Sequence, residues 1–241
     1  MFLLLLFAAA APPAPAAEPE AVVKRAIAAH GGADRLARLR QVREQTRGTL
    51  LVLGTKVPFT SDTLMRLPGQ FRSEIVTELR GRKLRVIQVL DGPRGWLSDN
   101  GTVRAADAAT LADWREVAHA SHVAMLTPLL ARDKGYTLTA LGEEALAGRK
   151  VVGVKVAVKG RRDVRLWFDK ENGLLVKKSF WPRAGGKEAV QDEVYEDFKV
   201  IDGVKRPTRF RVYLGGKEHA RAELTSAKFL DRIDDKEFAK P

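Results

Sequence analysis

The sequence predicts a mainly β protein: a meander of antiparallel strands with a few helices, folded as one domain. After Gln41 the apolar residues recur at every second position, which is the period of half-buried strands, whereas before it they recur at helical spacing. Pairs of turn-forming residues then separate the alternating runs at short intervals. No linker, low-complexity block or repeat of about 20–50 residues interrupts residues 18–241, so a single domain is expected there.

Residues 1–17 have the composition of a secretory signal peptide. Phe2–Ala11 is an uninterrupted apolar run, prolines follow it, and Ala14–Ala16 has the small-x-small spacing that signal peptidase recognises. No Lys or Arg precedes the run, so an uncleaved anchor or an upstream start remains an alternative to cleavage. Since the chain has no cysteine, lipid attachment at an N-terminal cysteine is excluded. We expect a periplasmic or secreted protein that is not a lipoprotein.

Two short helices are expected next. Glu20–His30 has its apolar residues on one helical face, and Gly31-Gly32 supplies the left-handed conformation that ends helices. Asp34–Arg40 follows with Leu36 and Leu39 inward.

About a dozen strands follow, joined mainly by short loops. Asn100-Gly101, Asn172-Gly173, Asp202-Gly203 and Gly215-Gly216 lie between alternating runs and provide the positive φ that tight hairpins require. The strands are expected at 46–54, 57–67, 71–79, 82–90, 94–99, 136–141, 150–159, 163–169, 174–181, 190–200, 206–214 and 217–230.

One helical segment, 107–130, interrupts the strands. Asp107 is a good N-cap, and Thr127-Pro128 is expected to kink or divide the segment. A single apolar stripe on it would pack across the concave side of the sheet; it consists of Leu111, Trp114, Ala118, Met125 and Leu129.

The search for catalytic chemistry excludes several classes. No cysteine is present for disulfides, zinc fingers or thiol nucleophiles, and the nucleophile-elbow, phosphate-loop, dinucleotide and zincin motifs are absent. Asp192, Glu193, Glu196 and Asp197 leave paired-carboxylate glycoside chemistry as an alternative, although nothing fixes their separation. No catalytic residue and no cofactor is therefore expected.

Two histidines leave a metal-assisted hydrolase as a further alternative. His119 and His122 are three apart on the 107–130 helix, a spacing that a metal can use. Helical geometry places His122 in the centre of the apolar stripe, His119 at its edge and Glu116 well around the helix, so the three do not converge. We therefore expect no metal site, with His122 half-buried and bonded to a backbone carbonyl, and His30 satisfying the carbonyls at its helix end.

Basic charge gathers in one hairpin. The chain has 42 Lys and Arg against 30 Asp and Glu, and seven of the basic residues lie between Arg149 and Arg165, opposed only by Asp163. Strand alternation turns the valines inward and leaves Lys155, Lys159, Arg165 and Trp167 outward. This outer face is either a docking patch for anionic membrane or an acidic partner, or an ordinary soluble surface. Nucleic acid is not expected, since no recognition helix or aromatic stacking motif is present.

Five segments give the chain a family resemblance: Ala28–Leu39 (AAHGGADRLARL), Gly148–Val158 (GRKVVGVKVAV), Leu166–Lys177 (LWFDKENGLLVK), Tyr195–Pro207 (YEDFKVIDGVKRP) and Phe229–Phe238 (FLDRIDDKEF). With these, and with helices inserted after the fifth strand, the chain resembles the LolA/LolB-like lipoprotein carrier superfamily, of the outer membrane lipoprotein-sorting type and like the N-terminal half of RseB.

The resemblance implies an unclosed, strongly curved antiparallel half-barrel of about 11–12 strands whose concave face is covered by helices. It also implies a non-enzymatic carrier that holds an acyl chain, including that of a lipoprotein, or another hydrophobic ligand in the cavity, and we expect it to be a monomer. For each cavity position ordinary core packing is the alternative. The expected cavity residues are Phe59, Met65, Phe71, Ile75, Leu84, Val86, Leu166, Phe168, Phe180 and Phe210, and the expected lid residues are Trp114, His122, Met125 and Leu126.

Overall fold

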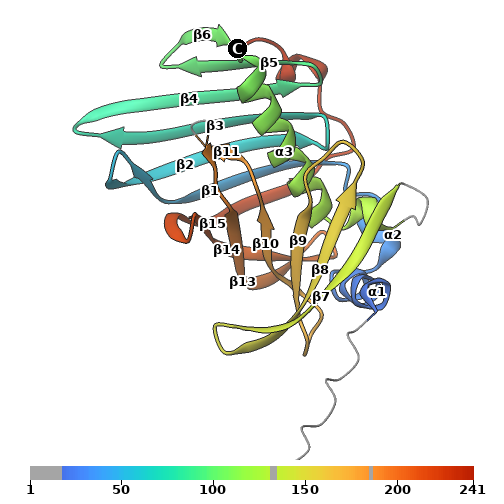
Figure 1. The fold of residues 1–241 in the computed structure, drawn as a ribbon. Coiled ribbons are helices and arrows are strands. Elements are labelled where there is room, and N and C mark those ends of the chain that lie inside the picture. Colours follow the sequence, from blue (N-terminus) through green and yellow to red (C-terminus); the bar gives the residue numbers. More distant parts are fainter. Residues whose placement is uncertain (1–17, 131–134, 185–186) are drawn as a thin grey trace, which may run out of the picture.

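One open sheet of thirteen strands dominates the molecule (Figure 1). The computed structural model describes residues 18–130, 135–184 and 187–241, so the expected signal peptide lies outside the described residues. All neighbouring strands of the sheet are antiparallel, in the order β6-β5-β4-β3-β2-β1-β15-β14-β13-β10-β9-β8-β7. The predicted unclosed half-barrel is confirmed.

The strands of the sheet are β1 (Gln41–Val52), β2 (Thr55–Arg66), β3 (Gln70–Leu79), β4 (Arg82–Asp91), β5 (Arg94–Asp99), β6 (Thr102–Ala105), β7 (Tyr136–Leu146), β8 (Arg149–Val158), β9 (Val164–Asp169), β10 (Leu175–Phe180), β13 (Gln191–Ile201), β14 (Val204–Leu214) and β15 (Lys217–Phe229). A separate two-stranded ribbon comprises β11 (Arg183–Ala184) and β12 (Lys187–Glu188). The helical elements are α1 (Pro19–Ala29), α2 (Ala33–Leu36), α3 (Ala108–Ala124), and the 3-10 turns η1 (Thr127–Leu129) and η2 (Asp235–Phe238).

The sheet consists of two meanders joined through one pairing. β1 pairs with β15 along its length, with Val42 opposite Phe229, and this pairing brings together strands from distant parts of the sequence. Edge strand β6 was missed by the strand prediction because four residues are too few to show an alternation.

Three of the four expected turns form as predicted. Asn100-Gly101, Asp202-Gly203 and Gly215-Gly216 all have positive φ at both residues, while at Asn172-Gly173 only the glycine does. Because paired positive φ values match the twist of the flanking strands, these turns hold neighbouring strands in register.

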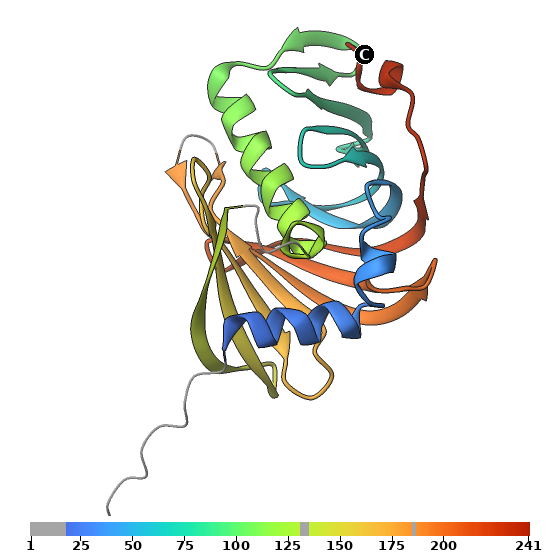
Figure 2. The same cartoon turned by 90° about the vertical axis from the view of Figure 1, so that its right-hand side faces the viewer.

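Helix α3 crosses the concave side of the sheet (Figure 2). It contacts β4 in one meander and β9 and β10 in the other, while α1 packs on β7 and β8. The predicted interruption of the helical segment is confirmed, since α3 ends at Ala124 and Leu126 has a left-handed φ of 61° before η1. Close packing depends on Gly95 of β5, because a Cβ there would lie 2.7 Å from a methyl group of Leu111 on α3.

Two apolar cores flank α3. The larger lies against β8–β10 and includes Ala120 and Val123 of the helix; the smaller lies against β3 and β4 and includes Ala118. The convex face of the first meander has its own cover, because Ile233 and Phe238 of the C-terminal segment pack there. Among the described helices none is long and apolar enough to cross a membrane.

Candidate ligand-binding site

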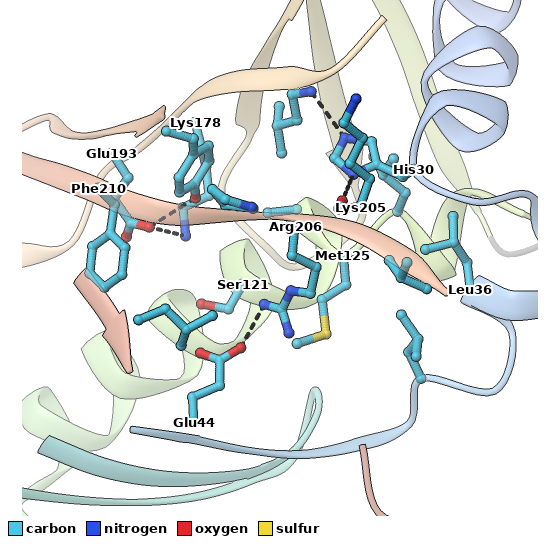
Figure 3. Close-up of a pocket in the computed structure, with 18 of the residues that line it drawn as sticks. His30, Leu36, Glu44, Ser121, Met125, Lys178, Glu193, Lys205, Arg206 and Phe210 are labelled. Atoms are coloured by element: carbon cyan, nitrogen blue, oxygen red, sulfur yellow. Dashed lines mark hydrogen bonds and ion pairs between the residues drawn. The ribbon is translucent and has the colours of Figure 1, made fainter. Parts of the chain in front are cut away.

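A cavity of about 210 Å³ lies between the concave face of the sheet and the C-terminal end of α3 (Figure 3). Its apolar walls come from α2 and the residues that follow it, from the sheet, and from the last residue of α3 and the two residues that follow it. The apolar lining residues are Leu36, Leu39, Met65, Ala124, Met125, Leu126, Leu175, Val204, Pro207, Phe210, Leu224 and Phe229.

Strand register places the expected cavity residues of the first meander on one face. Met65 of β2 lies opposite Phe71 of β3, and Ile75 lies opposite Val86 of β4. Phe59 and Leu84 share the same face, because both lie opposite Thr77. Of these residues Met65 lines the cavity, and Phe71 packs edge-to-face on Trp114 of α3, with ring centroids 5.8 Å apart.

The half-buried residues Phe59, Ile75, Leu84 and Val86 lie further along the concave face and do not line the cavity. Phe59 instead shares a second, more open depression of about 840 Å³ with Phe210, and Phe210 also lines the cavity. The two depressions are therefore adjacent at Phe210.

Three expected cavity residues of the second meander form part of the packed core. Leu166, Phe168 and Phe180 are each at most 2% exposed and belong to the cluster that packs against α1 and α3. Of the expected lid residues, Met125 and Leu126 line the cavity, while Trp114 and His122 do not.

An ion pair forms part of the cavity wall. Lys178 of β10 is 2% exposed and its Nζ lies 3.0 Å from Oε2 of Glu193 on β13. The Tyr195 hydroxyl donates to the same carboxylate oxygen at 2.9 Å, and burial raises the pKa of Tyr195 well above its usual value. A bulge after Leu175 lets β10 present Leu175, Lys178 and Phe180 to the interior.

A second ion pair crosses the cavity. Nη2 of Arg206 on β14 lies 2.6 Å from Oε1 of Glu44 on β1, with both side chains less than one-fifth exposed (Figure 3). The guanidinium carbon lies 5.4 Å from the centroid of the Phe229 ring, a cation–π distance. Arg206 thus reaches from one meander to the strand that begins the other.

His30 holds the end of α1 onto two strands. Its Nε2 accepts the Leu175 amide at 3.1 Å, so Nδ1 carries the proton and donates to the Lys205 carbonyl at 2.6 Å. Burial lowers the pKa of His30, which keeps the ring neutral. The expectation that His30 satisfies the carbonyls of its own helix end is wrong, because its two partners are the Leu175 amide on β10 and the Lys205 carbonyl on β14.

Sequence reasoning missed these polar groups, although alternation contains a signal for them. Lys178 has the parity of Phe180, and Arg206 has that of Phe210, both of which were expected to face inward. A search for charged residues at the inward positions of strands would therefore have identified Lys178 and Arg206.

Of the two histidines of α3, His122 is half-buried as expected. His119, expected at the edge of the apolar stripe, is 4% exposed and stacks on Tyr136 of β7, with ring centroids 6.2 Å apart. His119 is the more buried of the two because α3 also packs on the second meander beside the expected stripe, where Tyr136 covers the imidazole ring. Within the described ranges no three His, Asp or Glu side chains are grouped to hold a metal ion.

The basic residues lie on the convex side of β8 and β9. Lys155 lies opposite Arg165 on the neighbouring strand, and its Nζ is 3.6 Å from Oδ2 of Asp163. Lys159 is exposed. The guanidinium carbon of Arg165 lies 4.7 Å from the centroid of the Trp181 ring. Trp167 was expected to be an exposed aromatic on this face, but it is only 8% exposed. It packs with Val151 and Val176 under Lys177, so it is part of a small outer core.

Solved structures share this fold. A LolA superfamily protein from Nitrosomonas europaea matches with a TM-score of 0.54 at 15% identity, over 86% of this chain and 96% of its own. A putative outer membrane lipoprotein-sorting protein domain from Vibrio parahaemolyticus matches with a TM-score of 0.53 at 10% identity, over 91% of this chain and 95% of its own. A DUF1329 family protein from Desulfovibrio piger matches with a TM-score of 0.56 at 13% identity, over 92% of this chain and 97% of its own.

The predicted resemblance to the LolA/LolB-like superfamily is thus confirmed as a likeness of fold. No family model and no curated protein matches the sequence.

Proposed function

We propose that the protein is an exported, monomeric, non-enzymatic carrier that holds an acyl chain or another hydrophobic ligand under α3. The observation that supports this most is the cavity of about 210 Å³, whose walls are mainly apolar and which adjoins the depression containing Phe59 and Phe210. Ligand sites of this kind are concave and largely apolar with a few polar groups. The shared fold of lipoprotein-sorting proteins supports the same function, and no cofactor is needed for it.

Native mass spectrometry of the chain lacking residues 1–17 tests the proposal. A co-purifying lipid that organic extraction removes, and uptake of an alkyl ligand by the extracted protein, are the expected results. Ser121→Trp should abolish uptake, because Ser121 lines the cavity and an indole there occupies the ligand volume. The matched control is Ala112→Trp, since Ala112 is an exposed residue of the same helix. Equal uptake by both variants, or no lipid with no uptake, contradicts the proposal.

A second function, docking onto anionic membrane or an acidic partner, is supported by the exposure of Lys159 and Arg165 on one convex face. Reversing Lys155, Lys159 and Arg165 to Glu should remove salt-dependent binding to anionic vesicles. Binding that survives the triple reversal contradicts this function. Ligand uptake in the same variant separates docking from carriage, since these side chains do not line the cavity.

A further inference from the structure

We propose that the cavity is selective for single-chain amphiphiles with an anionic carboxylate or phosphate head, and that Arg206 binds this head. The inference rests on the proposed carrier function and specifies its ligand class.

Arg206 has a donor left over. Its Nη2 contacts Glu44, but its Nη1 is buried and has no hydrogen-bond partner among the described residues. A guanidinium carries five N–H donors and no acceptor, so the missing partner must be an acceptor oxygen. A buried cationic donor without an acceptor is unfavourable, which a bound anion in the cavity relieves.

Each carboxylate of the wall faces an internal cation. Glu193 contacts Lys178 and the hydroxyl of Tyr195. Oε1 of Glu44 lies 2.6 Å from Nη2 of Arg206 as an ion pair, although this oxygen, like Nη1 of Arg206, has no hydrogen-bond partner among the described residues. A cationic head would therefore have to displace an internal cation, whereas an anionic head meets a free donor.

The other charges of the wall cancel. The two cation–carboxylate pairs are neutral together, and His30 is neutral. Lys205 borders the cavity, but strand alternation puts its side chain on the face of β14 opposite to that of Arg206, where its partner across the ladder, Val200, is 69% exposed. The free donor of Arg206 is therefore the group that distinguishes an anionic head from a neutral one.

The remainder of the cavity suits an alkyl chain. Leu36, Leu39, Leu224 and Phe229 contribute only hydrocarbon, so a wholly polar anion would leave apolar wall uncovered. An anionic head attached to an alkyl chain satisfies both parts of the lining.

Displacement of a neutral phenylnaphthylamine dye at about pH 8, where a carboxylic acid is ionised, tests the selectivity. The competitors are hexadecanoic acid, hexadecyl phosphate, methyl hexadecanoate and hexadecanol. For the wild-type chain lacking residues 1–17, at least one anionic competitor should bind roughly tenfold or more tightly than the neutral ones, since a hydrogen bond to a charged group contributes that much. Preference for both anions assigns recognition to negative charge, and preference for only one assigns the head group.

Three variants locate the effect at Arg206. Arg206→Gln should remove the anionic preference, so that acid and ester bind equally, whereas Glu44→Gln should strengthen the preference by releasing the guanidinium. The control is Arg43→Gln, which breaks the ion pair of Arg43 with Asp62 on the convex face and should keep the preference. If Arg206→Gln fails to fold because Glu44 is left unpaired, the Glu44→Gln/Arg206→Gln double variant removes both charges and should show the same loss.

Equal binding of acid and ester by the wild type, or a preference that persists without Arg206, overturns the inference but leaves the carrier function standing. Failure of every competitor and of the dye to bind overturns both.

Discussion

Lys178 and Glu193 form an ion pair inside the curve of the sheet, with Nζ and Oε2 3.0 Å apart and only 2% and 19% of the two side chains exposed. Removing one member of such a pair leaves a buried charge without its partner. We expect Lys178→Met to lower the free energy of unfolding by about 3–5 kcal/mol.

The Lys178→Met/Glu193→Leu double variant should recover most of this loss, because it leaves no charge behind. Urea denaturation of the single and double variants measures both values. As a control, Lys170→Met breaks the exposed pair with Glu143 and should change stability by less than about 1 kcal/mol. A Lys178→Met variant as stable as the control contradicts the prediction.

Stability should decrease as the pH falls below neutrality. Burial lowers the pKa of His30 in the folded chain, whereas the unfolded chain takes up the proton near the ordinary value of 6.5. The free energy of unfolding is therefore highest above pH 6.5 and falls as the pH drops from 6.5 towards the lowered pKa, because the unfolded state binds more protons there.

Urea midpoints at about pH 7.5 and about pH 5.5 measure this dependence. His30→Gln should show a smaller fall than the wild type. Some fall should remain, because burial lowers the pKa of His119 in the same direction. An identical fall in both proteins is the outcome that rules out a role for His30.

Gly95 should be required for α3 to lie close to β5. An added Cβ would lie 2.7 Å from Leu111 Cδ2 and 2.9 Å from the Val89 carbonyl oxygen, closer than packed atoms approach. Gly95→Ala should cost about 1–3 kcal/mol, as overpacked cores do. Gly69→Ala is the matched control, since nothing lies within 4 Å of that position. Thermal unfolding of the two variants provides the comparison, and equal melting temperatures contradict the prediction.

Phe238 should anchor the C-terminal segment on the convex face. Its side chain is fully buried with Ile87, Val89 and Ile233, and the Arg66 guanidinium lies 5.0 Å from the ring centroid. Phe238→Ala should therefore lower stability by about 3–5 kcal/mol. Leu53→Ala, at a side chain that is 89% exposed, should stay within about 0.5 kcal/mol. Hydrogen exchange that leaves β3 and β4 as protected in Phe238→Ala as in the wild type would falsify the anchoring role.

Alternation and turn chemistry were sufficient to predict most strands, because both are local. The alternate valines of β8 and alternate apolar residues of β9 share one face as expected, since a strand of regular pleat fixes the side of each residue; these are Val152, Val154, Val156, Val164, Leu166 and Phe168. The pairing of β1 with β15 has no local signal. It depends on the whole sheet having formed, so only a family resemblance or a structure provides it.

The candidate site was predicted less completely than the fold. Met65, Met125, Leu126 and Phe210 line the cavity, but apolar inward residues have the same pattern in a filled core, as Phe168 shows. Which of them border empty space depends on how far α3 stands from the sheet, a distance set by tertiary packing. The charged residues were missed because outward and inward positions were assigned from the apolar residues alone.

The pairing of β1 with β15 also determines when a cavity first exists. Glu44 and Arg206 lie on opposite sides of β15 in the sheet, so they face each other only after that strand, the last in the sequence, has been inserted between β1 and β14. Contacts between distant parts of a chain form slowly because loop closure precedes them. A ligand therefore cannot guide the early steps of folding. Under the proposed function, a ligand would enter only after the sheet is complete.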